Sequence, residues 1–297
     1  MISVIICSTS QHFLNQVKNS INTTIGVEYE VLFYDNTVEG KGICEVYNLL
    51  AQKAKFSYLC FVHEDVIFNT PNWGRIVEKI FINEKAGLVG VAGSKYKSQY
   101  FSGWYTDNSI CDCENIIHQE RVTGESEKVY LNYYPGTLLQ EVVSIDGVFM
   151  CATKSVWEKT KFNESRLKGF HFYDIDFSTR VSSYSKILVT YEIELVHFTH
   201  GGDFGDKWVV EAIKWHLQNK NNLPIYLSEL NTNGFDRNLI KWWLDWLKIH
   251  KVSFLNRIRW IYLQKLYLIP GLYYAIIKFF VYEPFKLNHL HRLAKRK

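Results

Sequence analysis

The sequence predicts an α/β fold built on a doubly wound sheet with helices on both faces, and three observations lead to this prediction. Continuously apolar, β-branched runs such as 2–7 are typical of buried strands in a parallel sheet. Segments with apolar residues at helical spacing separate these runs, as in 12–21. The order strand, helix, strand, helix, strand fills residues 2–66, and this alternation is the signature of a doubly wound sheet.

The individual elements follow from the same two patterns. We expect, in order, a strand over 2–7, a helix over 12–21, a strand over 28–36, a helix that includes 46–54, a strand over 58–66, a helix over 73–82 and a strand over 87–93. Residues 95–139 show little periodicity and are expected to form an irregular insertion of loops and short strands. A strand and the start of a helix are expected in 142–157, a helix near 176, and two short strands in 186–198.

The chain changes character near Asp236, where Leu, Ile, Trp and Tyr begin to recur at helical spacing among Lys and Arg. We therefore expect one α/β domain over 1–225 and a helical, aromatic and basic extension over 236–297. Pro270–Gly271 is expected to divide the extension into two helices. Such helices can lie in a membrane interface, or they can pack on the domain or form a dimer interface. No stretch of about 20 residues is free of charge and proline, so a membrane span is not expected.

Composition and cysteine usage narrow the class of protein. The 297 residues are 47% hydrophobic and 22% charged, which is ordinary for a globular protein, and a net charge of +4 does not suggest a nucleic-acid partner. Cys7, Cys60 and Cys151 lie in apolar runs, where a thiol acts as a small hydrophobe. The sequence has no CxxC pair, and it opens directly on a strand. A reducing, cytoplasmic setting is the expectation that follows.

Polar groups that follow predicted strands are the first candidates for chemistry, because ligands of such sheets bind beyond the carboxyl ends of the strands. The second strand ends in Asp35–Asn36 and the third in His63–Glu64–Asp65. A carboxylate there can hold Mg²⁺ or Mn²⁺ together with the phosphates of a substrate. The alternative is a solvated loop or a helix cap.

Two later clusters add candidates. Asp174 stands just before a predicted helix, where it can act as a base or simply as the N-cap, and Asp176 and Arg180 are spaced to pair on that helix. His197 and His200 follow the last strand, beside glycines, where they can ligate a metal or contact a phosphate. A lone histidine is more often structural, but three polar clusters at strand ends favour a site.

These motifs, taken in order, resemble a known family. The series SVIICS, VLFYDN, YLCFVHEDV, SIDGVFMCATKSVW, GFHFYDIDFSTRV and LVHFTHGG is similar to family 2 type glycosyltransferases with a GT-A fold. The resemblance is greatest to the subset that has HED in place of the common DxD motif, and it covers roughly residues 1–215.

The resemblance implies a role for each matching position. Asp174 would be the catalytic base, with Tyr173 in place of a Glu. The donor would be bound by Ser8, Asp35, Asn36, His63, Glu64 and Asp65. Asp65, with His197 or its rival His200, would hold a divalent cation, Mn²⁺ or Mg²⁺. Asp146, Gly147, Tyr173 and Asp176 would lie on the acceptor side, and Arg180 belongs to the same helix start.

The implied activity is transfer of a sugar from a nucleotide-diphosphate donor to a hydroxyl of a glycan or lipid-linked glycan, with inversion and metal assistance. The enzyme would work in the cytoplasm or at the inner face of the membrane. Two alternatives stay open. A nucleotidyltransferase shares the nucleotide-binding sheet, although the loop STSQHFLNQ lacks glycine and has only Lys18 nearby. A non-catalytic module that binds nucleotide sugars or glycans could keep the same fold.

Overall fold

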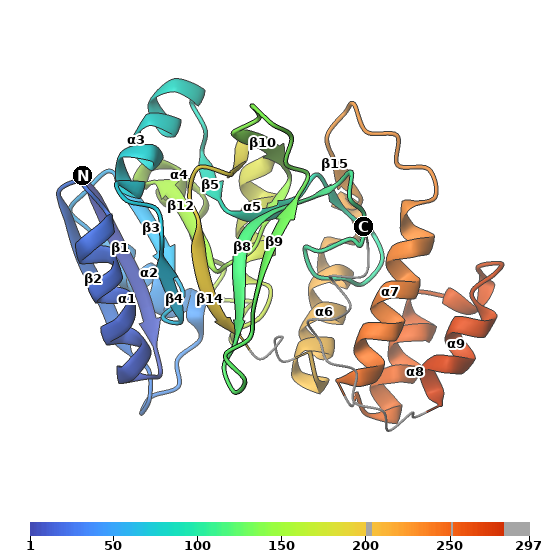
Figure 1. Ribbon diagram of the computed structural model, residues 1–297. Helices are drawn as coiled ribbons and strands as arrows, with labels where there is room; N and C mark the ends of the chain where they lie inside the picture. Colours follow the sequence, from blue (N-terminus) through green and yellow to red (C-terminus); the bar gives the residue numbers. More distant parts are fainter. Residues whose placement is uncertain (200–203, 251, 282–297) are drawn as a thin grey trace.

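The computed structural model describes residues 1–199, 204–250 and 252–281, and a seven-stranded mixed sheet forms its centre (Figure 1). The strand order is β10–β13–β5–β12–β3–β1–β2. The strands are β1 (Ile2–Ser8), β2 (Tyr29–Asp35), β3 (Tyr58–Val62), β5 (Leu88–Gly90), β10 (Leu139–Val142), β12 (Phe149–Thr153) and β13 (Ile187–Thr190). Strands β2, β1 and β3 run parallel, whereas β12 is antiparallel to both of its neighbours. The prediction of an α/β fold is confirmed.

Helices cover both faces of this sheet, as a doubly wound fold requires. They are α1 (Gln11–Thr24), α2 (Ile43–Lys53), α3 (Trp73–Glu84), α4 (Lys154–Thr160) and α5 (Tyr173–Ser182). Strand β1 shows how the sequence fills both faces: Ile5 joins the core cluster that contains α2 and α5, whereas Val4 and Ile6 join the cluster that contains α1 and α3. A strand buried on both sides has no polar face, which explains its continuous apolar run.

A second sheet lies beside the first and was not expected from the sequence. Its order is β11–β6–β8–β14–β4, with β9 paired to β8. The strands are β4 (Val66–Phe68), β6 (Ala92–Ser94), β8 (Asp112–Glu120), β9 (Ser126–Leu131), β11 (Ser144–Ile145) and β14 (Leu195–Thr199), and a separate pair joins β7 (Tyr96–Lys97) to β15 (Ile225–Tyr226). The single strand predicted over 87–93 is wrong, because β5 and β6 belong to different sheets. The insertion predicted over 95–139 does consist of loops and strands, but it is not irregular throughout, because β8 and β9 form a regular hairpin.

The C-terminal part is helical and packs against the α/β part with its aromatic side chains. It comprises α6 (Asp206–Asn219), the 3₁₀ turn η1 (Lys220–Asn222), α7 (Phe235–Ile249), α8 (Phe254–Leu263), η2 (Leu266–Leu268) and α9 (Tyr273–Phe280). The rings of Trp208 and Trp243 stack at 4.7 Å, and Trp243 Nε1 donates to the Tyr105 carbonyl at 3.3 Å. Pro270–Gly271 interrupts the helices as predicted, and a second interruption, which was not predicted, falls between α7 and α8.

None of the helices in the described ranges combines the length and the apolar character that crossing a bilayer requires.

Cysteines 60 and 151 form a disulfide between the neighbouring strands β3 and β12. Their interpretation as two thiols that serve only as apolar side chains is therefore wrong. Both residues sit in continuously apolar runs, so local pattern could not reveal that the two strands pair in this register. The expectation of a reducing compartment rested partly on the assumption that these cysteines are free thiols. The disulfide removes that argument.

Candidate active site

The parallel strands β2, β1 and β3 end at one edge of the main sheet and bring three polar segments together. Ser8 at the end of β1 is in register with Asp35 at the end of β2. His63 follows β3, and its backbone N–H donates to the Val148 carbonyl at 3.1 Å. Asp65 then leads into β4 of the second sheet. The run 58–66 is thus two strands joined by a turn, and the turn carries the polar side chains.

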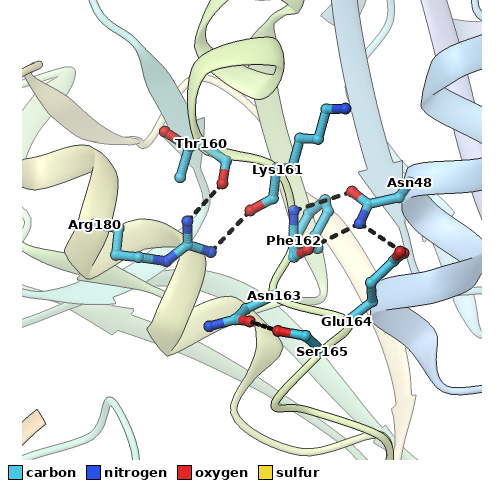
Figure 2. Close-up of a pocket in the computed structure, with 8 residues that line it drawn as sticks. All are labelled: Asn48, Thr160, Lys161, Phe162, Asn163, Glu164, Ser165 and Arg180. Carbon is cyan, nitrogen blue, oxygen red and sulfur yellow. Dashed lines mark hydrogen bonds between the residues drawn. The ribbon is translucent and has the colours of Figure 1, made fainter.

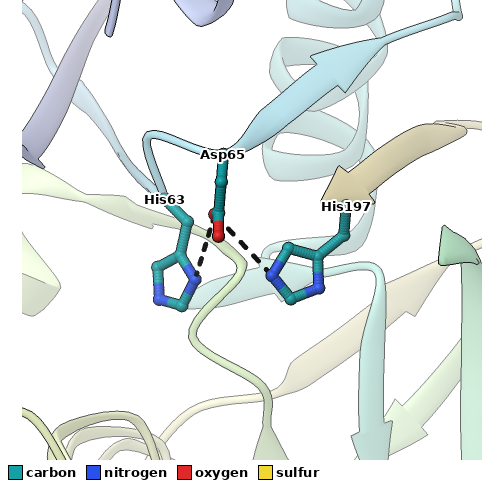
Figure 3. Close-up of side chains that lie close together, drawn as sticks. All are labelled: His63, Asp65 and His197. Atoms are coloured by element: carbon teal, nitrogen blue, oxygen red, sulfur yellow. Dashed lines mark ion pairs between the residues drawn. The ribbon is translucent and has the colours of Figure 1, made fainter. Parts of the chain in front are cut away.

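Asp65 lies between two histidines that come from different sheets (Figure 3). Its Oδ1 atom is 3.9 Å from Nδ1 of His63 and 3.7 Å from Nε2 of His197 on β14. The side chains are only 13–18% exposed, and Oδ1 is buried without a hydrogen-bond partner. A buried carboxylate oxygen without a hydrogen bond is costly unless something binds it. One ligand atom from each residue lies within 4.8 Å of the others, so the cluster has the size of a metal site.

The protonation states at this cluster suit a metal ligand set. Burial lowers the pKa of His197 to about 4, so the imidazole is neutral near pH 7 and keeps a lone pair. Burial acts to raise the pKa of Asp65, but His197 and His63 in their protonated forms, together with Arg121, outweigh it and hold that pKa below the usual value. Near pH 7, where His197 is neutral, Arg121 is the permanent positive charge beside Asp65. Two imidazoles and one carboxylate, completed by substrate phosphates, fit a metal such as Mn²⁺.

Arg121 is a residue of this site that sequence reasoning missed. It follows β8 at the turn of the β8–β9 hairpin, and its guanidinium forms an ion pair with Oδ2 of Asp65. The guanidinium also stacks on the Phe13 ring at 4.6 Å, and its Nε donates to the Phe198 carbonyl at 2.9 Å. A cation is therefore fixed next to the cluster. Nothing in the local sequence marks Arg121, because the hairpin itself was not predicted.

Tyr173 lies between the histidine cluster and a second pair of carboxylates, Asp146 and Asp174. Its hydroxyl lies 2.7 Å from Nε2 of His63. If that nitrogen carries the proton, Nδ1 of His63 keeps its lone pair toward Asp65, which is how a partner at the far ring nitrogen usually orients a ligating histidine. Tyr173 is 3% exposed and also packs against Tyr47. Its position at the start of α5 fixes the ring in place.

Asp146 and Asp174 converge on Gly147. The Gly147 N–H donates to Oδ2 of Asp174 at 3.1 Å, while Asp146 accepts from the Val148 N–H at 2.8 Å and from Trp104 Nε1 at 2.5 Å. Burial, followed by the charge of Asp146, raises the pKa of Asp174 to about 7. A carboxylate that takes up and releases a proton near neutral pH is suited to be a general base.

Asp174 does not cap its helix, so that alternative is wrong. The N-cap position is Phe172, which lies outside the helical region with a positive φ, and Asp174 sits within the first turn of α5. Asp176 does pair with Arg180, as its spacing predicted. However, Asp176 is buried and its other oxygen accepts from Trp215 Nε1 at 3.1 Å. One oxygen of Asp176 is thus held within α5 by Arg180 and the other links α5 to α6 through Trp215, so neither is free for an acceptor.

Ser8 and Glu64 bind each other. The Ser8 hydroxyl donates to Oε2 of Glu64 at 2.6 Å, and the N–H groups of Thr9 and Ser10 donate to the same carboxylate at 3.0 Å and 2.9 Å. Glu64 therefore holds the loop between β1 and α1. Because the N–H groups of Thr9 and Ser10 already donate to Glu64, they are not available to bind a triphosphate. This counts against a nucleotidyltransferase. Lys18 lies over the Phe33 ring instead of in the loop.

Asp35 and Asn36 shape the loop that follows β2. Asp35 accepts from the N–H and hydroxyl of Thr37, and these bonds lower its pKa. Asn36 exchanges two hydrogen bonds with the backbone of Lys41. Asp35 stays exposed at the edge of the site. His200, the rival of His197, lies outside the described residues.

A pocket of about 360 Å³ lies elsewhere, between α2 and the segment that joins α4 to α5 (Figure 2). Asn48 fills one side and bonds to the backbone of Phe162, and Arg180 donates to the carbonyls of Thr160 and Lys161. Of the predicted site residues, the pocket includes Arg180 alone. Its polar groups are already bonded to one another, so it has no evident chemistry.

Comparison with known proteins gives the family and the fold of the chain. A family model described as "Glycosyltransferase like family" matches residues 3–222. Among solved structures, residues 1–349 of S. aureus TarS superpose with a TM-score of 0.52 at 12% identity, covering 88% of this chain and 78% of that one. The complex of the same fragment with UDP gives 0.51 at 13% identity, with the same coverage. The chain spans 47% of the longer S. aureus TarS structure, with a TM-score of 0.51. No curated protein matches the chain.

Proposed function

Because the chain belongs to the glycosyltransferase-like family, we propose that it transfers a sugar from a nucleoside-diphosphate donor to a hydroxyl group, with inversion. The observation that carries the proposal is the buried Oδ1 of Asp65, which lies between His63 and His197 without a hydrogen-bond partner, together with the Asp174 carboxyl, whose pKa is about 7. In this proposal His63–Glu64–Asp65 serves in place of a DxD motif. UDP-sugars are the first donors to test, since the structures of the S. aureus TarS fragment include UDP and UDP-GlcNAc complexes.

Asp65, His63 and His197 are the residues that would hold a divalent cation. When bound there, Mn²⁺ or Mg²⁺ supplies charge neutralisation for the departing nucleoside diphosphate. Arg121 stands beside this cluster and adds a fixed positive charge. A preorganised cation in a partly buried site stabilises developing negative charge without reorganisation. Arg121 is therefore assigned to the leaving group, and it exchanges Asp65 for a phosphate oxygen when the donor binds.

Asp174 is assigned as the base. Its carboxylate takes the proton from the acceptor hydroxyl, whose oxygen attacks the anomeric carbon in line while the bond from that carbon to the diphosphate oxygen breaks. Gly147 orients the carboxylate through its N–H, and Asp146 raises its pKa. Asp35 at the edge of the site is assigned to the nucleoside. The division into a catalytic domain over 1–225 and an extension over 236–297 is part of the same proposal, with a glycan or lipid-linked acceptor bound on the Asp146 side.

The test separates donor binding from transfer. Thermal shift with UDP-, GDP-, dTDP- and CMP-sugars, with and without Mn²⁺, finds the donor, because a ligand that binds the folded state raises its melting temperature. Asp65→Ala should lose the metal-dependent part of the shift. Asp174→Asn should bind donor as the wild type does and should not transfer sugar. Glu158→Gln, an exposed acid on α4, is the matched control and should leave both unchanged.

Two results would count against the proposal. One is normal transfer by Asp174→Asn, which would remove the assigned base. The other is a folded wild-type protein that shows no shift with any of the donors. We also propose a cytoplasmic location, where nucleotide sugars are supplied.

A further inference from the structure

Helices α8 and α9 are apolar on two sides, and among the described residues only one of these sides is covered by the rest of the protein. In α8 the buried residues include Arg257, Trp260 and Ile261, whereas Phe254, Ile258 and Tyr262 point outward at intervals of four. Helix α9 repeats this arrangement, with Phe279 buried and with Tyr273 and Ile277 exposed. A surface helix of a globular protein normally has a polar outer face. The outer sides of α8, η2 and α9 are called here the outer face.

The outer face holds most of the strongly exposed apolar side chains of the described residues. Of the nine large apolar side chains that are at least 60% exposed, six belong to it: Phe254, Tyr262, Leu268, Tyr273, Tyr274 and Ile277. Neighbouring rings extend the face, since Phe254 lies 5.6 Å from the partly buried Phe280 and Tyr262 stacks on Tyr267 at 6.2 Å. A contiguous apolar surface of this kind usually marks an interaction site.

The charge distribution indicates what covers the outer face. Residues 246–297 contain 11 of the 34 lysines and arginines and only one of the 30 acids, Glu283. This segment therefore carries a net charge of +10, and residues 1–245 carry −6. Arg259 and Lys265 are exposed on α8 and just after it. Lys278 on α9 is paired with Asp245, so Arg259 and Lys265 are the cations that the face leaves exposed to solvent. An apolar face rich in Tyr and Phe with exposed cations beside it is complementary to an anionic lipid surface.

The same charges argue against two other occupants. A second copy of the chain on this face would bring two strongly cationic segments together, and like charges in contact are unfavourable. Residues 282–297 contain five lysines and arginines and one acid, so their charge is complementary to an anionic bilayer and not to a cationic face. We infer that the outer face of α8, η2 and α9 docks the protein peripherally on an anionic membrane. This inference does not depend on the proposed transfer chemistry.

Docking on a membrane would favour a lipid-linked acceptor. In Figure 1, α8 and α9 lie at the lower right, and the arrowheads of β1 and β14 point to the same lower side. The carboxyl end of β1, where the candidate active site begins, thus points toward the lower side of this view, where α8 also lies.

Flotation of the full-length protein with vesicles tests the inference. Vesicles of phosphatidylcholine alone are compared with vesicles that contain about a third phosphatidylglycerol, at low and at high salt. We expect binding to the anionic vesicles only, weakened by salt. Tyr274→Ser with Ile277→Ser removes two exposed apolar side chains and should weaken binding at least ~10-fold. Val38→Ser with Val122→Ser, which alters side chains that are 92% and 82% exposed elsewhere, is the matched control and should bind as the wild type does.

Three outcomes would overturn the inference. One is equal binding to neutral and anionic vesicles, or none to either. Another is that the control pair weakens binding as much as the outer-face pair. The last is a wild-type dimer that the outer-face pair converts to a monomer, which would show that a second copy covers the face. Donor thermal shift on the same variants should be unchanged, so a failure of docking is distinguishable from a failure of the proposed transfer.

Discussion

A single methyl group added at Gly147 tests whether the segment that carries Asp146 is coupled to the histidine cluster through Tyr173. A Cβ at this position would lie 2.5 Å from Cζ of Tyr173 and still closer to its hydroxyl oxygen. Tyr173 is 3% exposed and packed among aromatic rings, so it has little room to move. Overpacking of this kind costs about 1–3 kcal/mol. Displacing the ring also breaks the 2.7 Å hydrogen bond to His63, which adds about 1 kcal/mol.

Gly147→Ala should therefore lose about 2–4 kcal/mol of unfolding free energy, which for a protein of this size lowers the melting temperature by roughly 4–16 °C. It should also bind Mn²⁺ more weakly, because Tyr173 no longer orients His63. Gly169→Ala is the control, since a Cβ there meets no atom within 4 Å. Calorimetry and metal titration measure the two effects. If Gly147→Ala melts and binds Mn²⁺ as Gly169→Ala does, the reasoning is refuted.

Four further predictions concern charge and redox state. Transfer should fall as the pH drops through about 7, because Asp174 must be deprotonated; a rate that is flat from pH 5 to 8 would exclude it as the base. The pKa of Asp174 is higher in the folded protein than its ordinary 3.8, so its contribution to the unfolding free energy should decline as the pH rises from about 4 to about 7, a loss absent in Asp174→Asn. Arg121→Ala should strengthen Mn²⁺ binding without nucleotide by roughly fivefold, since it frees Asp65, and should weaken UDP binding; calorimetric titration that finds both affinities unchanged would contradict its assignment. Protein purified without reductant and then unfolded should show four titratable thiols of its six cysteines, whereas six would mean that Cys60 and Cys151 are not joined.

The parts of the fold that local pattern determines were predictable. The apolar runs and helical spacings of the first 66 residues correctly gave β1, α1, β2, α2 and β3, because each pattern reflects burial against the nearest neighbour in the chain. The second sheet was not predictable in this way. Its strand β8 pairs with β14 through Ile116 and Leu195, residues far apart in sequence, and no local period records that pairing.

The same distinction between local pattern and long-range pairing explains which residues of the candidate site could be predicted. Asp65, His63 and His197 could be proposed because each stands at the end of a recognisable strand, and the structure brings them within reach of one another. Arg121 could not, because it is carried by a hairpin of the second sheet. The residue types alone also failed to separate Asp174 from Asp176. Only the packing of α5 shows that Trp215 and Arg180 engage Asp176, while Asp174 faces Gly147.

The disulfide between Cys60 and Cys151 affects what happens to the protein after a single proteolytic cleavage. It joins the strand before His63 to the strand after Gly147, and 91 residues of sequence separate its ends. A protease that cleaves once between these cysteines, for example at the exposed hairpin tip near Val122, would leave two polypeptides that still migrate as one until a reductant is added. The nicked protein would also keep the ends of β3 and β12 together. An enzyme nicked at this hairpin could therefore look intact on a non-reducing gel and retain the two edges between which its substrate would bind.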